Sequence, residues 1–348
     1  MIESMRNRHA ITTALVLIWT AAAVHGAPPA PVPVRIPPLD SLAANIVRLG
    51  AIPGAGGLPV LAAASGWYGR IDDIRVLDPG GPEFRRILAD DSGTWCYCGW
   101  AAWPERDGAV LVLAPPPYCL PGPLAPTVAP GDTVAFDLVG YDLLPDPAAA
   151  LLTPSGTVED LLPDGTARFS FRADERGVYW IEVLENGPNG PAVSLLFPVI
   201  SGGDAADVLD GGMPVGSPGA ATREQVLADL DSRRAASGAP PLQRSAALDS
   251  IAGLRASALA LSGSNDHLSE GRGLEQMLPP GVGPFAENIA RGGDFRECWS
   301  MILISPFHLR SCVSPDYRHV GIGAAVDWGD GEWQLVMVLV LTGEAPAP

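Results

Sequence analysis

The chain has 348 residues, 47% of them hydrophobic, and a formal net charge of −17 at neutral pH. This length and hydrophobic content suffice for two or three folded domains and argue against global disorder. The acidic charge would repel phosphate backbones and anionic lipid surfaces, so we expect neither nucleic-acid binding nor a polybasic membrane contact.

The first 26 residues have the features of a secretory signal peptide. Arg6 and Arg8 precede a mostly apolar run over residues 10–23, and small residues precede a predicted cleavage site before Ala27. The apolar run is too short for a typical membrane span, although an N-terminal anchor is the alternative. The apolar stretch 335–341 is shorter still. We therefore expect a mature chain without a transmembrane segment, secreted to the periplasm or the extracellular space, where disulfides are permitted.

Residues 27–38 are rich in proline and indicate an extended linker. Residues 39–120 then predict a small β-rich domain. Apolar residues at helical spacing favour one short helix over residues 39–49. Three short apolar runs are typical of strands, at residues 58–61, 74–77 and 109–113.

Three of the five cysteines lie in this first domain. Cys96 and Cys98 are two residues apart, so on a strand both would point to one face, and Cys119 is the obvious partner for one of them. A disulfide is the favoured interpretation in an oxidising compartment, and a zinc site is the alternative. The sequence does not decide which of the two cysteines would pair with Cys119.

Residues 121–201 predict an immunoglobulin-like β-sandwich. Short runs with partial alternation are separated by Gly-, Pro- and Asn-rich turns, and they cover residues 133–139, 167–171, 178–183 and 193–197. The run from Gly177 to Val183 resembles a late strand of bacterial immunoglobulin-like modules. We interpret this region as a passive spacer or adhesive module. Residues 202–221, rich in Gly, Pro and Asp, predict an interdomain linker.

Residues 222–345 predict an α+β domain in which helices sandwich a small antiparallel sheet. Thr222 begins a capping box, and Gly238 ends the helix that follows it. Further helices are expected over residues 245–261 and 294–304, the latter ended by Pro306. Strands are expected over residues 320–326 and 333–341.

Several ordered motifs of this last domain match one known family. Residues 286–290 read Ala-Glu-Asn-Ile-Ala, residues 305–308 read Ser-Pro-Phe-His, and residues 315–323 read Pro-Asp-Tyr-Arg-His-Val-Gly-Ile-Gly. With His267 after the second helix, this pattern resembles the CAP superfamily of cysteine-rich secretory, antigen 5 and pathogenesis-related proteins in its short bacterial form. Phe307 replaces a family glycine, and the second cleft glutamate of many eukaryotic members has no counterpart near Trp299.

The resemblance implies that His267, Glu287 and His308 meet in one polar cleft. Two imidazoles and a carboxylate can hold zinc or another divalent cation weakly, or transfer protons. Glu287 would act as a ligand or as a hydrogen-bond partner that fixes the loop. His319 is expected to be a surface residue. No G-x-S-x-G or H-E-x-x-H motif supports hydrolysis directly.

We therefore expect a secreted CAP-domain protein with a metal-capable His/Glu cleft that binds a small molecule, a lipid or an envelope or extracellular partner. Two alternatives remain. One is a metal-assisted, protease-like hydrolase that uses His267, Glu287 and His308 as its catalytic candidates. The other is a structural envelope protein.

The remaining cysteines, Cys298 and Cys312, predict a disulfide. Cys298 lies on the helix that Pro306 ends, so the chain must turn back before Cys312. That return can bring the two Cα atoms within the roughly 4.4–6.8 Å that a disulfide requires. The alternative is two separate buried thiols, because cysteine is often a small core residue.

Overall fold

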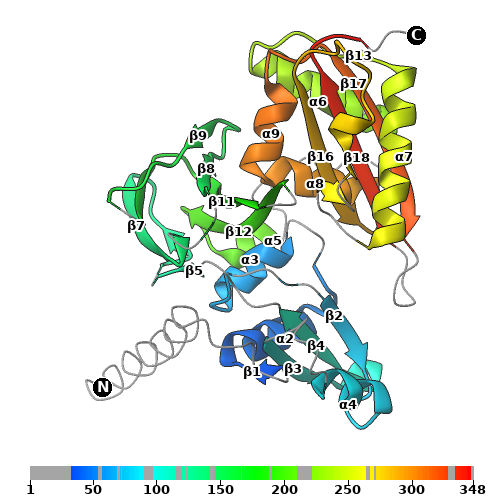
Figure 1. Ribbon diagram of the computed structural model, residues 1–348. Coiled ribbons are helices and arrows are strands. Elements are labelled where there is room, and N and C mark those ends of the chain that lie inside the picture. The colour runs from blue at the N-terminus through cyan, green and yellow to red at the C-terminus, as the bar shows by residue number, and fades with distance from the viewer. Residues whose placement is uncertain are drawn as a thin grey trace.

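The computed structural model (Figure 1) describes residues 33–345 apart from residues 54–56, 69–70, 72, 90–96, 115–119, 123, 142–143, 145, 166, 188–189, 210–221, 264–266, 270–271 and 328–333. The predicted signal peptide, Cys96, Cys119 and most of the predicted linkers lie outside the described residues. No helix in the described ranges is long and apolar enough to cross a membrane.

The N-terminal region is a four-stranded sheet with helices packed against it, rather than a purely β-rich domain. The strand order is β1-β3-β4-β2. The elements are β1 (Val34–Arg35), α2 (Pro37–Leu49), α3 (Gly57–Ala64), β2 (Asp73–Leu77), α4 (Pro82–Leu88), β3 (Tyr97–Trp103), the 3-10 turn η1 (Pro104–Arg106) and β4 (Gly108–Ala114). Helix α2 lies directly on β3, where a Cβ atom at Gly99 would come within 2.1 Å of the Leu39 backbone.

Most of the elements predicted in this region are confirmed. Helix α2 covers the predicted residues 39–49 and begins earlier, at Pro37, because proline fits the first helical turn. Strands β2 and β4 coincide with the predicted runs at 74–77 and 109–113. The strand predicted at 58–61 is wrong: these residues belong to α3, and short apolar runs do not distinguish a strand from a buried helix.

Residues 120–201 form two sheets packed face to face, which we call the β-sandwich. One sheet has the order β10-β7-β5 and the other β6-β12-β11-β8-β9. The strands are β5 (Leu120–Pro121), β6 (Thr127–Val128), β7 (Asp132–Val139), β8 (Ala148–Leu152), β9 (Val158–Asp160), β10 (Arg168–Ala173), β11 (Gly177–Gly187) and β12 (Gly190–Ser201). Aromatic side chains from both sheets, including Phe136, Phe169 and Phe197, fill the core between them.

The outer face of the five-stranded sheet is also buried, against the C-terminal domain. Along β11, Tyr179 and Ile181 point into the β-sandwich core, whereas Val178 and Trp180 point the other way. These outward residues share one apolar cluster with Leu309 of the C-terminal domain. Figure 1 shows β8, β9 and β11 beside helix α9 (Pro306–Val313). The β-sandwich is therefore docked onto the C-terminal domain, which corrects its interpretation as a passive spacer.

The C-terminal domain is a four-stranded sheet covered by helices on both faces, as predicted. The order is β13-β17-β18-β16, with β13 parallel to β17 and the other pairs antiparallel. The short helix α5 (Ala205–Leu209) precedes this domain and packs against α3. The elements of the domain are α6 (Arg223–Ala236), β13 (Gln243–Arg244), α7 (Ala246–Ser262), β14 (Leu268–Ser269), β15 (Arg272–Gly273), the 3-10 turn η3 (Leu274–Gln276), β16 (Phe285–Gly292), α8 (Phe295–Ile304), α9, β17 (His319–Asp327) and β18 (Gln334–Thr342). Helix α7 covers one face, and α6, α8 and α9 cover the other.

The predicted helix boundaries of this domain follow from side-chain caps. Thr222, Ser245 and Asp294 each accept a hydrogen bond from a backbone N–H of the first turn of α6, α7 and α8. The two glycines of β17 have a different role. A Cβ atom at Gly321 or Gly323 would lie 2.2 or 2.1 Å from the backbone of α7. Glycine at these positions lets α7 pack closely on the sheet, which fixes the helix that carries Arg255.

Candidate functional site

Strand β16 carries the centre of the site at the edge of the sheet. It is the last strand in the sheet order, and its consecutive residues Glu287 and Asn288 point to opposite faces. Glu287 faces helix α7, and Asn288 faces helix α9. As the edge strand of this sheet, β16 carries neighbouring side chains that contact both helical layers.

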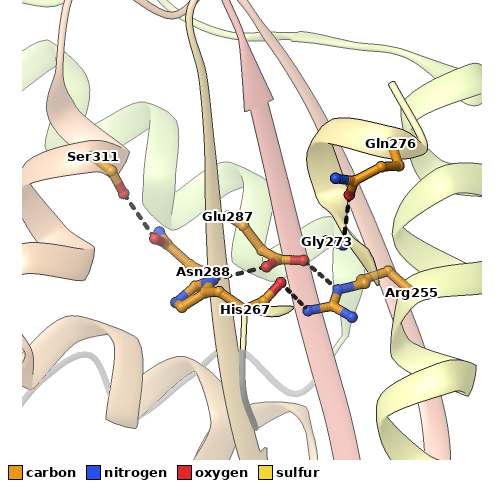
Figure 2. A network of polar contacts seen from close by, with 7 residues as sticks. All are labelled: Arg255, His267, Gly273, Gln276, Glu287, Asn288 and Ser311. Atoms are coloured by element: carbon orange, nitrogen blue, oxygen red, sulfur yellow. Dashed lines mark hydrogen bonds and ion pairs between the residues drawn. The ribbon is translucent and has the colours of Figure 1, made fainter. Parts of the chain in front are cut away.

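Glu287 is held by two partners that the structure brings from different segments (Figure 2). One carboxylate oxygen accepts a hydrogen bond from Nε of Arg255 on α7 at 2.8 Å, and the other contacts Nδ1 of His267 at 2.8 Å. A terminal nitrogen of Arg255 also donates to the backbone carbonyl of His267 at 2.8 Å. The side chains of Arg255 and Glu287 are only 2% and 5% exposed.

This arrangement fixes the orientation of the His267 ring. Both carboxylate oxygens of Glu287 are engaged. A carboxylate beside an arginine can only accept a hydrogen bond, so we assign the ring hydrogen of His267 to Nδ1. A histidine whose Nδ1–H is held by a carboxylate presents its Nε2 lone pair as the available base or ligand. Glu287 therefore acts here as the partner that orients His267.

Asn288 ties the same strand to the segment that carries His308. Its amide nitrogen donates to the carbonyl of His308 at 3.2 Å, and its amide oxygen accepts from the hydroxyl of Ser311 at 2.9 Å. Figure 2 shows Asn288 and Ser311 beside the Glu287 cluster. Asn288 is buried, so these hydrogen bonds fix the position of helix α9 relative to β16.

His308 lies in the first turn of α9 and has an unusual environment. Its Nδ1 atom is buried and has no hydrogen-bond partner among the described residues. Burial, with a smaller contribution from nearby His267, lowers the pKa of His308 to about 4. At neutral pH its imidazole is therefore uncharged and has a lone pair available.

Comparison with known proteins identifies this domain. Residues 227–341 match the model of the cysteine-rich secretory protein family, CAP. The C-terminal region is a CAP domain. Its predicted boundaries, residues 222–345, enclose the matched residues, and the Glu-Asn pair on β16 and the Ser-Pro-Phe-His motif at the start of α9 lie inside the match.

Three solved structures are similar to the chain. An outer surface protein from Borrelia burgdorferi is 15% identical, with 35% of this chain and 91% of that chain covered and a TM-score of 0.31. An extracellular protein containing an SCP domain from Bacillus anthracis is 16% identical, with 48% and 65% covered and a TM-score of 0.30. A cysteine-rich secretory protein from Staphylococcus aureus is 14% identical, with 61% and 76% covered and a TM-score of 0.27. No curated protein matches the chain.

The candidate site contains two imidazoles, those of His267 and His308. Within the described part of the chain, no group of three or more His, Cys, Asp or Glu side chains is arranged to hold a metal ion. Glu287 is committed to Arg255 and His267. The candidate ligands left are therefore the imidazoles of His267 and His308.

The structure does not contain the Cys298–Cys312 disulfide that the sequence predicts, and both residues are free, buried thiols. The Cys298 thiol donates to the carbonyl of Leu335, whereas the Cys312 sulfur accepts from Asn288, whose strand partner is Leu339. Four residues along a strand span about 13 Å, which separates the two contact points. Cys98, a candidate for the other bridge, is also a free buried thiol.

Sequence reasoning missed two residues that shape the site. Arg255 interrupts the apolar face of α7, and an arginine at such a position signals a buried acidic partner. Glu182 lies on β11 of the β-sandwich and is fully buried, yet it bonds to the segment that carries His308. Its only signal in the sequence is a charged residue within the apolar run from Val178 to Leu184.

Proposed function

We propose that the protein is a secreted binding protein whose CAP cleft takes a divalent cation, such as zinc, weakly through His267 and His308. The observation that carries this proposal is the buried Nδ1 of neutral His308, which has no partner among the described residues and lies near enough to an oriented His267 to feel its charge. Leaving a buried acceptor unsatisfied is costly, and a cation or a ligand donor would relieve that cost.

The geometry argues against a hydrolase that uses Glu287 as its general base. A general base needs a carboxylate or imidazole free to take a proton from water or substrate. Both oxygens of Glu287 are engaged by Arg255 and His267, so Glu287 does not meet this requirement. The proposed ligand is a small molecule, a lipid or an envelope component, with a bound cation as a polar anchor.

Secretion is supported by the features of the first 26 residues and by the character of the CAP family. We also infer that the β-sandwich is immunoglobulin-like. Tyr179 near the start of β11 bonds through its hydroxyl to the backbone of Glu175, at 2.7 Å from the nitrogen. This matches the tyrosine corner of immunoglobulin-like domains.

Calorimetric titration of the mature full-length protein with zinc chloride at pH 7.5 tests the proposal. We expect about one equivalent of weak binding that is lost in His267→Ala and in His308→Ala. His319→Ala is the matched control and should bind as the unmodified protein does. Glu287→Gln should weaken binding about 10–100-fold, because the carboxylate orients His267. Unchanged binding in the His267→Ala/His308→Ala double variant would refute the proposal.

A further inference from the structure

Both cleft histidines are approached by one hairpin of the neighbouring β-sandwich. Strands β11 and β12 pair from Gly177↔Ser201 to Gly187↔Gly190. At the tip, a Cβ atom on Gly190 would lie 3.0 Å from Cβ of His267. Further down the hairpin, Glu182 bonds to Ser305 and Phe307. The hairpin therefore contacts His267 at its tip and, further down, the segment that carries His308.

Glu182 makes its contacts where α9 begins. Its carboxylate accepts the Ser305 hydroxyl at 2.9 and 2.8 Å and the Phe307 amide at 3.0 Å. Because the Ser305 hydroxyl proton is donated to Glu182, its oxygen is free to accept the backbone N–H of His308, at 3.2 Å. The Ser305 hydroxyl thus links the carboxylate of Glu182 to the backbone N–H of His308 by hydrogen bonds on both sides.

These bonds satisfy donors that a helix start leaves open. Pro306 has no N–H, and the next two N–H groups, of Phe307 and His308, are taken by Glu182 and Ser305. The carboxylate also lies at the positive end of the α9 dipole, which offsets part of the cost of burying it. No residue of the CAP domain supplies this carboxylate. It comes from the other domain.

Apolar packing and an ion pair between the β-sandwich and α9 surround Glu182. Trp180, two residues earlier on the same face of β11, lies in one apolar cluster with Leu309 of α9. On the solvent side, Arg310 of α9 pairs with Asp160 of β9 at 2.6 Å. The docking surface therefore has an apolar centre, one buried carboxylate aimed at the His308 turn, and an exposed ion pair.

We propose that the binding site spans two domains: Glu182 of the β-sandwich is a positioning residue that fixes His308 through the Ser305 hydroxyl and the Phe307 amide. The β-sandwich is thus part of the ligand-binding unit. This inference rests on the proposed function for its binding readout, but the position of the His308 backbone is measured independently of any ligand.

The test compares five full-length variants. Glu182→Leu removes both acceptors at similar volume, and Glu182→Gln keeps an acceptor. Ser305→Ala keeps Glu182 but removes the link to His308. The controls are Asp160→Asn, which breaks the exposed ion pair of the same interface, and Ser300→Ala, a serine on α8 whose hydroxyl bonds only within its own helix. Each is assayed for zinc affinity and for the backbone amide resonances of Phe307 and His308.

We expect Glu182→Leu and Ser305→Ala to lower zinc affinity at least tenfold and to shift the His308 amide resonance. Glu182→Gln should stay within about threefold of the unmodified protein, as should both controls. If Glu182→Leu does not fold, Ser305→Ala decides. Unmoved His308 amide resonances and unchanged affinity in Ser305→Ala would overturn the proposal, as would an equal loss in Asp160→Asn. If the unmodified protein binds no zinc, the proposed function fails, and the amide resonances alone decide the positioning role.

Discussion

Replacing Arg255 by methionine should destabilise the protein strongly. The methionine side chain fills similar space on α7 but removes the guanidinium that binds Glu287 and the carbonyl of His267. Glu287, with 5% of its side chain exposed, would keep only His267 as a partner. Its charge would then be buried without the cation that balances it.

The size of the effect follows from this burial. Breaking a buried ion pair by removing one partner costs about 3–5 kcal/mol, because an uncompensated charge remains. Replacing both partners removes that charge as well, so Arg255→Met combined with Glu287→Leu should cost less than the sum of the single changes, by about 0.5–3 kcal/mol. The exposed Arg310–Asp160 pair is the matched control, and Asp160→Asn should cost about 0–1 kcal/mol.

Equilibrium urea denaturation of the full-length chain, followed by far-UV circular dichroism, measures these changes in unfolding free energy. Hydrogen exchange of the β16 amides reports whether the loss is centred on the site. A loss below about 1 kcal/mol for Arg255→Met, or strict additivity in the double variant, would show that the pair does not hold the site as described.

Three further outcomes are expected. Burial raises the pKa of Glu182 from 4.5 to about 7, so the folded state binds this proton more tightly and the unfolding free energy should fall by about 3 kcal/mol as the pH rises from about 4.5 to 7. Glu182→Gln should remove that slope, and an identical pH profile in the variant would contradict the assignment. The ring protons of His308 should titrate near pH 4 by NMR, and a midpoint at or above 6.5 would be inconsistent with its burial. Cys298 and Cys312 should react with iodoacetamide only after unfolding, whereas a bridged peptide in unreduced digests would contradict two free thiols.

The CAP domain was predictable because its signals are local. Capping side chains at Thr222, Ser245 and Asp294 and the stop at Pro306 depend on residues a few positions apart. The ordered motifs around Glu287 and His308 add a family resemblance that the matched model confirms. The error at residues 58–61 has a local cause as well, since four apolar residues fit a strand and a buried helix equally.

The two cysteines show where local reasoning ends. The sequence correctly placed Cys298 on a helix that ends just before Pro306, but the expected return of the chain does not bring Cys312 into a disulfide with it. Which way each thiol points depends on how α8 and α9 pack on β16 and β18. That packing sends Cys298 to Leu335 and Cys312 to Asn288.

The sequence by itself determined helices α6, α7 and α8, strands β17 and β18, the CAP resemblance and the candidate residues His267, Glu287 and His308, because periodicity, caps and motifs depend on residues close together in the chain. It did not predict β16 or α9, which carry Glu287 and His308. Only the tertiary structure decided that Arg255 and Glu287 pair across 32 residues and that Glu182 reaches Ser305 across 123. Such contacts join residues whose separation along the chain carries no pattern. They form because burying the outer face of β11 against α9 removes apolar surface from water, and Glu182, on that same face, must then find its partners in the other domain.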